Sequence, residues 1–257
     1  MVNTYQYNRL QMIKSLIFMA ASFCLFHFLG AYYVPDPSLT SATMWEGIFY
    51  VLANVRFLAM QFWLSFFFML YLTVGELTDY EVIYRSEHKR EWLSREIVRL
   101  FVNCGVFCLC YLVMVLLFNL IVHGWPSTIG IGKAMLFVIP VNYSIGFILL
   151  LALLSRLFSS IAVALLYFLF YLEIKNRSLP AVILGIYSFF SVIALHFGVI
   201  FRSSLSKFLL FPSGIDYYFY TFGSIAGNFC AGIAFPLFLS VLVVVILLAR
   251  IKKLEFL

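Results

Sequence analysis

The sequence predicts an all-α integral membrane protein. Hydrophobic residues make up 64% of the 257 residues, and charged residues make up only 11%. Soluble domains contain about 25% charged residues, so a soluble fold of this size would have too few charges to cover its surface. The apolar runs are long and uninterrupted, whereas the strands of a membrane barrel alternate over about ten residues. Because lipid cannot satisfy open backbone groups, helices are the structure that these runs favour.

Six apolar segments are long enough to cross a bilayer, which takes about 20 residues in a helix. We predict spans at residues 13–33, 46–74, 97–122, 144–173, 179–201 and 225–249, forming one transmembrane domain over residues 1–257. The first segment is long and lacks a small-residue cleavage site, which predicts a retained helix rather than a signal peptide. The region 134–173 could instead be divided near residues 155–160, which would give seven spans.

The distribution of Lys and Arg decides between six and seven spans. Twelve would lie on one side of the membrane and three on the other: Arg9, Lys14, Arg85, Lys89, Arg90, Arg95, Arg99, Lys175, Arg177, Arg250, Lys252 and Lys253 against Lys133, Arg202 and Lys207. Basic residues favour the cytoplasmic side. The pattern therefore predicts a multi-pass plasma-membrane protein with both termini in the cytoplasm, which requires an even number of spans.

Several classes of function lack their residue patterns here. The net charge of +6 follows the span ends, and no RNA-binding aromatic motif is present, so we expect no nucleic-acid partner. There is no Gly-rich phosphate loop, Ser-His-Asp order or His-Glu-x-x-His pair. The five Cys lie in apolar stretches, as packing residues do. We therefore predict no catalytic, cofactor-binding or metal-binding residue on this chain.

The most polar region of the sequence is residues 76–99, between the second and third predicted spans. Its part 79–97 contains no helix breaker and is rich in strong helix formers. Charges of both signs with a partial apolar stripe are typical of a helix that lies on the membrane surface. The same pattern is found in helices that enter a groove on a soluble partner. A plain connector between two spans remains an alternative.

This segment resembles the coupling-helix region of ABC-2-type transporter permeases. The matching residues are Arg85-Ser86, Lys89-Arg90, Trp92-Leu93 and Arg95. The whole chain resembles the family in its size, its six predicted spans and its cytoplasmic ends, whereas the motif covers some 20 residues. The chain departs from the family in lacking a clear amphipathic helix before its first span.

The resemblance implies the membrane subunit of an ATP-driven exporter, paired with a second permease copy. ATP and Mg would bind a separate ABC ATP-binding subunit, and a peptide, a lipid or another amphipathic compound would be the substrate. The expected contacts with that subunit come from Tyr84, Arg85, Glu87, Lys89, Trp92 and Arg95, with Tyr84 and Trp92 as anchors. A non-transporting membrane assembly or sensor-partner protein, using the same loop for protein contact, is the alternative.

Two Arg residues fall inside predicted spans, where charges are costly and often functional. Arg56, with Asn54 beside it, could line an internal pathway that meets anionic substrate or lipid. It could equally be a structural pair or reach the interface with its long side chain. Arg156 presents the same choice, and we place it towards the inner leaflet.

Overall fold

The structure, a computed structural model, describes residues 4–33, 44, 48, 51–52, 58–74, 89–123, 145–174, 176–196 and 230–254. Within these residues only Asn176 and Arg177 are outside a helix, and no strand occurs. The elements are α1 (Thr4–Tyr33), the π-helical turn η1 (Leu58–Trp63), α5 (Leu64–Val74), α7 (Lys89–His123), α8 (Ile145–Ile174), α9 (Ser178–His196), the π-helical turn η2 (Cys230–Ala234) and α13 (Phe235–Leu254). The all-helical prediction is confirmed for this part of the chain.

Three of the described helices are long and apolar enough to cross a membrane. They contain the stretches Lys89–Ile121, Leu149–Ile174 and Gly232–Ile251. Gln61–Val74 and Ser178–Ser191 are shorter apolar helices. The chain is thus a helical membrane protein, as its composition predicts.

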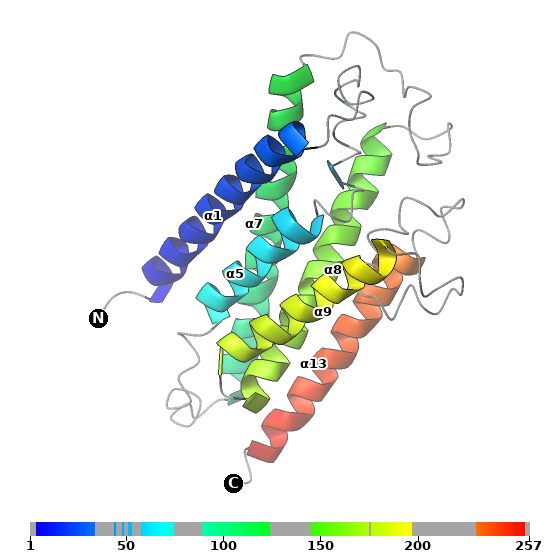
Figure 1. Cartoon of the computed structure of the whole chain (residues 1–257). Helices are drawn as coiled ribbons and strands as arrows, with labels where there is room; N and C mark the ends of the chain where they lie inside the picture. The colour runs from blue at the N-terminus through cyan, green and yellow to red at the C-terminus, as the bar shows by residue number, and fades with distance from the viewer. Residues whose placement is uncertain are drawn as a thin grey trace.

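The described helices run alternately in opposite directions, as Figure 1 shows. Contacts fix the pairs: Phe18 meets Phe68 and Ser22 meets Ser65, so α1 and α5 are antiparallel. In the same way, Phe62 of η1 contacts Phe107 of α7, and Thr73 of α5 contacts Arg99 of α7. The segment η1–α5 is therefore antiparallel to α7. The beginning of α1 and the end of α13 consequently lie at the same end of the bundle (Figure 1).

Helix α8 has neighbours on several sides, because it packs against α7, α9, α13, η2 and α5. Small residues on its buried surface, such as Ala152, Ala162 and Ala164, let neighbouring helices approach closely. A larger share of α8 is buried than of the apolar stretches in α7 or α13. Side chains on α8 are therefore placed to meet residues from most of the other elements.

Some predicted boundaries agree with the structure and others do not. The segment predicted at 144–173 is one unbroken helix, α8, so no division occurs near residues 155–160. The predicted span at 97–122 lies within α7, which runs continuously from Lys89 to His123. Residues 89–104 include many helix formers and contain no Pro or Gly, so nothing interrupts the helix near residue 97. Likewise, α1 already begins at Thr4 and includes the polar residues before the predicted span.

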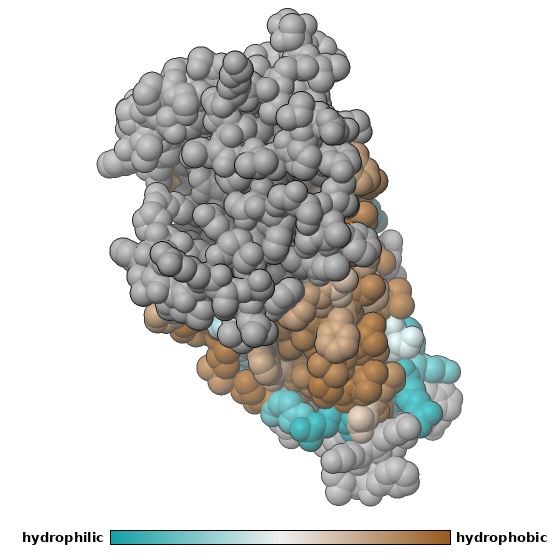
Figure 2. Space-filling model, turned by 90° about the vertical axis from the view of Figure 1, so that its right-hand side faces the viewer, coloured by the Kyte–Doolittle hydropathy of each residue, from teal (hydrophilic) through white to brown (hydrophobic). Residues whose placement is uncertain are grey.

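The outer surface of the described helices is apolar. On α7, exposed hydrophobic residues recur every three or four positions, whereas the opposite face is buried in the core: Val98, Val102, Val106, Leu109, Val113, Leu117 and Ile121 are exposed. Figure 2 shows a continuous hydrophobic surface that gives way to hydrophilic residues near one end. A water-facing helix would carry polar residues on this face, so the surface is suited to lipid or to another transmembrane helix.

Candidate functional site

Basic side chains gather at one end of the bundle, which we call the basic end. It contains the first part of α1, the end of α5, the start of α7, the α8–α9 connection and the end of α13 (Figure 1). The described basic side chains at this end are Arg9, Lys14, Lys89, Arg90, Arg95, Arg99, Arg177 and Arg250. Among the basic side chains that the structure describes, Arg156 is the one that does not lie at the basic end.

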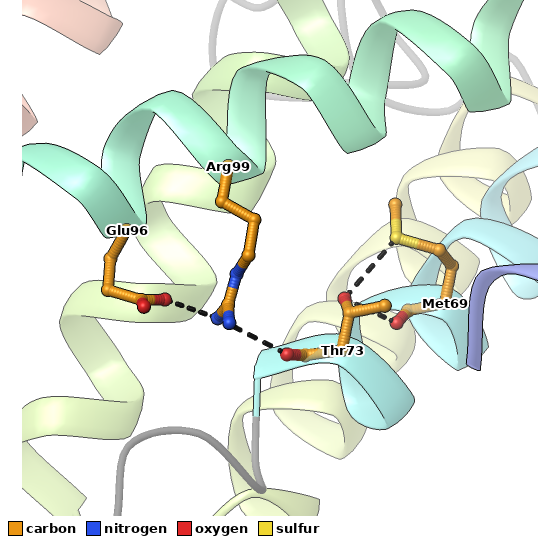
Figure 3. Close-up of polar contacts among 4 residues, drawn as sticks. All are labelled: Met69, Thr73, Glu96 and Arg99. Atoms are coloured by element: carbon orange, nitrogen blue, oxygen red, sulfur yellow. Dashed lines mark hydrogen bonds and ion pairs between the residues drawn. The ribbon is translucent and has the colours of Figure 1, made fainter. Parts of the chain in front are cut away.

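A hydrogen bond from an ion-paired arginine, Arg99, joins α7 to α5 at the basic end. Arg99 pairs with Glu96 one turn earlier on α7, and the Arg99 Nη2 also donates to the carbonyl oxygen of Thr73 at 3.4 Å (Figure 3). Thr73 is one residue before the end of α5, where carbonyl groups lack partners within the helix. Its own hydroxyl donates back to the carbonyl oxygen of Met69 at 2.8 Å. The end of α5 thus contacts α7 at Arg99, ten residues after the first residue of that helix.

A second set of contacts fixes the α8–α9 connection at the same end. The Tyr167 hydroxyl donates to the Arg177 carbonyl oxygen at 2.6 Å, and the Arg177 guanidinium lies 5.1 Å from the centroid of the Tyr71 ring. The Ser178 amide donates to the Asn176 side-chain oxygen at 2.8 Å, a typical start for a helix. Glu173 pairs with Arg250 of α13 at 3.1 Å. These contacts tie α5, α8, α9 and α13 together.

The residues predicted to contact an ATPase are only partly described. Tyr84, Arg85 and Glu87 lie outside the described residues. Arg95 is exposed and Lys89 is half-buried, so both are accessible in the first turns of α7.

Trp92 departs from its predicted role as an exposed anchor. Its side chain is 7% exposed, and its ring lies 6.0 Å from the Phe168 ring of α8. It belongs to the partial apolar stripe that the sequence shows, and its ring faces α8. Trp92 therefore contributes to the core of this chain.

The interior of the bundle holds a buried cation, Arg156, whose side chain is 7% exposed. Its guanidinium carbon lies 5.0 Å from the centroid of the Phe62 ring and 5.9 Å from that of Trp63. Both rings come from η1, and π-helical turns are frequent at functional sites. The guanidinium thus lies among buried rings, away from the surface of the described helices.

Arg156 lies well away from the basic end. Phe62, beneath its guanidinium, is about 16 Å along the helix from Thr73 at a rise of about 1.5 Å per residue. The hydrocarbon layer of a bilayer is about 30 Å thick. Phe62, beneath the Arg156 guanidinium, is thus separated from the Thr73–Arg99 contact by about half of that thickness along the helix.

Further polar side chains are buried around Arg156. Ser155 is 3% exposed and Ser159 is 0% exposed, and within the described part of the chain neither hydroxyl has a hydrogen-bond partner. Ser159 lies three residues from Arg156 and four from Ser155, so all three occupy one side of α8. Next to them, Ser160 accepts a hydrogen bond from Cys108 of α7 at 3.5 Å. We call Ser155, Arg156 and Ser159, with the rings of Phe62 and Trp63, the Arg156 cluster.

The proposed pathway residues Asn54 and Arg56 lie outside the described residues. The Arg156 cluster was not predicted from the sequence as a site. The signal was nonetheless present, since Ser155, Arg156, Ser159 and Ser160 interrupt an otherwise apolar segment at helical spacing. Its significance depended on the rings of η1, which are almost 100 residues away in the chain.

The described residues contain no group of three or more His, Cys, Asp or Glu side chains that could hold a metal ion. Cys104 and Cys108 are buried on α7, as expected for packing residues. Comparison with protein-family models, with curated proteins and with solved structures found no match to this chain.

Proposed function

We propose that this chain is the permease subunit of an ATP-driven transporter of the ABC-2 type, with six spans and cytoplasmic termini in the plasma membrane. A separate ABC subunit would bind ATP and Mg, and two permease copies would form one export pathway for a peptide, a lipid or another amphipathic compound. The observation that carries the proposal is the charged, accessible start of α7 at the basic end, beside the segment 75–88. The sequence of residues 85–95 resembles the family's coupling helix.

Two features of the described helices support a transport role. Their alternating directions bring both described ends of the chain to the basic end, as the positive-inside rule requires for cytoplasmic termini (Figure 1). Ionisable residues inside membrane bundles often mark a substrate or ion pathway, and the buried Arg156 is such a residue.

The coupling role is tested on the accessible residues of α7. The variant Lys89→Glu/Arg95→Glu reverses two charges at the proposed interface, which should weaken association with an ATPase subunit and increase its salt dependence. Lys14→Glu is the matched control, because Lys14 is an exposed basic residue of α1 at the same end. Each protein is purified with a tag on this chain. ATP hydrolysis by the co-purified fraction is measured, and the polypeptides in that fraction are sequenced.

We expect wild type and Lys14→Glu to retain a polypeptide with a phosphate-binding loop and ATP hydrolysis, and the double variant to lose both. The coupling assignment would be overturned by a double variant that retains its ATPase. A wild-type protein that recruits no ATP-hydrolysing subunit would overturn the whole proposal.

The proposed pathway role of Arg56 is tested separately. If Arg56 with Asn54 lines a pathway, Arg56→Ala lowers transport while expression and thermal stability stay near those of wild type. Arg56→Lys keeps the charge but loses the planar fork, so a residue that only reaches the interface should tolerate it. A fall in stability that parallels the fall in activity would contradict the pathway role.

One observation favours the alternative, a non-transporting assembly or sensor-partner protein. Trp92 is used within the chain against Phe168, so the predicted docking segment lacks one of its two aromatic anchors. A protein of this kind would co-purify with a partner that does not hydrolyse ATP, and the Lys89→Glu/Arg95→Glu variant would lose that partner.

A further inference from the structure

We propose that the outer face of α1, over residues 9–17, binds anionic phospholipids in the leaflet next to the basic end. The lipid phosphate contacts Arg9 and Lys14, and an acyl chain lies along the apolar side chains between and beyond them. This face belongs to a different helix from the proposed ATPase contacts, so lipid binding here does not depend on the proposed function.

The first turns of α1 divide into an exposed side and a buried side. Within residues 9–17 the exposed residues are Arg9, Leu10, Ile13, Lys14 and Ile17. The buried side, which packs into the bundle, carries Gln11, Met12 and Ser15. At 3.6 residues per turn, Arg9 and Lys14 lie at the two edges of the exposed side, with the three apolar residues between them. Those three are 50%, 52% and 63% exposed, so two cations border an open apolar strip.

Lys14 is placed at the level where a lipid head group would lie. Helices α1 and α5 are antiparallel, with Phe18 against Phe68. One turn further along each helix, Lys14 is level with the last turn of α5, where the Thr73 carbonyl oxygen accepts a hydrogen bond from Arg99. Beyond Lys14, α1 contains no Asp, Glu, Lys or Arg up to its end at Tyr33. A Lys at such a boundary extends its ammonium group to the head groups while its alkyl stem stays against apolar atoms.

The charges of α1 have no counter-ion on their own helix, because α1 contains no Asp or Glu. Two other cations at the basic end are paired within the bundle: Arg99 with Glu96 and Arg250 with Glu173. An anionic group from outside the chain is therefore complementary in charge to the outer face of α1.

The combination of cations and apolar side chains favours a phospholipid over a free anion. Each basic residue near a membrane surface strengthens its attraction to anionic lipid by about fivefold, and an exposed apolar strip adds contact with acyl chains. A free phosphate ion would gain only the charge attraction, which salt screens. Helix α1 packs against α5, η1 and α7 and forms one side of the bundle (Figure 1), so its outer face is open to lipid.

Lipid preference is measured by native mass spectrometry of the full chain in a neutral detergent, with equal amounts of phosphatidylglycerol and phosphatidylcholine added. We expect wild type to retain phosphatidylglycerol at least about tenfold more than phosphatidylcholine. Lys14→Gln should reduce this preference about fivefold, and Arg9→Gln/Lys14→Gln should reduce it further. Arg250→Gln is the matched control, since Arg250 is also an exposed cation at the basic end but is paired with Glu173. It should keep the wild-type preference.

The location is measured with a phosphatidylglycerol that carries a photoactivatable head group. In wild type its crosslinks should map to the peptide that contains residues 9–17, and they should fall at least about fivefold in Lys14→Gln. An excess of inorganic phosphate at constant ionic strength should leave the crosslinks unchanged, because it lacks an acyl chain.

Several results would overturn the proposal. Equal retention of the two lipids by wild type would show that α1 does not select anionic head groups, and an equal loss in Arg250→Gln and Lys14→Gln would show that any basic residue at this end suffices. Competition by inorganic phosphate would replace the lipid with a free anion. Crosslinks between residues 10–17 of two chains would assign the face to a second copy. Selective lipid binding by a wild-type chain that recruits no ATPase would support this proposal and refute the transport proposal alone.

Discussion

At the scale of single residues, α7 shows how neighbouring positions acquire different roles. Trp92 and Arg95 both belong to the segment that resembles a coupling helix, and they are three residues apart. Trp92 is buried against Phe168, whereas Arg95 is exposed. The helix also places Arg99, paired with Glu96, towards α5, where its guanidinium donates to the Thr73 carbonyl oxygen (Figure 3). One face of the same few turns therefore holds the bundle together while the other is open to a partner.

Truncating Trp92 should destabilise the chain itself. Removing a large buried aromatic side chain costs about 3 kcal/mol or more, so Trp92→Ala should lower the unfolding temperature in detergent substantially. Arg95→Ala, on the exposed face, should change the free energy of unfolding by less than about 0.5 kcal/mol. Thermal unfolding of both variants measures the difference. Equal stability of the two would contradict the buried position of Trp92.

The Glu96–Arg99 pair should behave as a coupled unit. Arg99→Met leaves the mostly buried Glu96 carboxylate without its cation and should cost about 2 kcal/mol. Adding Glu96→Gln to it should restore part of that loss, since no buried charge then remains. A double-mutant cycle on thermal stability measures the coupling. Strictly additive effects of the two substitutions would show that the pair does not contribute to the fold.

At the scale of elements, helices α1 and α5 are held close by small polar residues. The Ser22 and Ser65 hydroxyls are 2.9 Å apart, and both side chains are buried. Small residues allow the backbones of membrane helices to approach, and hydrogen bonds between them add specificity. One turn towards the basic end, the rings of Phe18 and Phe68 meet with centroids 4.5 Å apart. The pair thus combines close packing with an aromatic contact.

Enlarging Ser65 should separate these two helices. Ser65 is fully buried, so Ser65→Leu overfills the contact and removes its hydrogen bond, at a cost of about 2 kcal/mol. The adjacent Leu64 is 47% exposed on the other face, and Leu64→Ala is the matched control with little expected effect. Thermal unfolding and disulfide trapping between Cys substitutions at Phe18 and Phe68 check the prediction. Unchanged trapping in Ser65→Leu would show that this contact does not set the spacing.

At the scale of the whole molecule, the surface is divided along the helix axes. On the face seen in Figure 2, the described residues form a hydrophobic area that is bordered by hydrophilic residues towards the basic end. The basic end joins segments that are distant in sequence, from Arg9 to Arg250. Membrane orientation depends on such a collective bias rather than on any single residue.

The orientation is tested by labelling with a maleimide that does not cross the membrane. Ser94 and Asn176 are exposed at the basic end, so Ser94→Cys and Asn176→Cys should react only after intact cells are opened. Ser41→Cys and Ser203→Cys should react from outside, because residues 38–43 and 203–206 are predicted to be external. Wild type gives the background from the native cysteines. Labelling of Ser94→Cys but not Ser41→Cys in intact cells would reverse the orientation.

The sequence by itself determined the helical membrane class, the unbroken helix over residues 145–174 and the gathering of basic residues at span ends. Those properties follow from composition, from the length of apolar runs and from the distribution of Lys and Arg between them. The helix α7 begins at Lys89, before the span that is predicted from residue 97, because a charged segment and an apolar segment can form one continuous helix when no breaker separates them. Hydropathy changes at that point, but backbone geometry does not.

Only the tertiary structure decided which polar residues are buried and what they meet. Arg156 and Arg95 are both arginines on long helices, yet one lies among the rings of Phe62 and Trp63 and the other is exposed. The difference depends on the rotation of each helix and on partners from distant segments. A period of 3.6 residues predicts which residues share a face, but in a membrane both faces can be apolar, so the pattern does not reveal which face is inside. Packing between helices makes that choice, and it brought Trp92 into the core and Arg156 to the centre of the bundle.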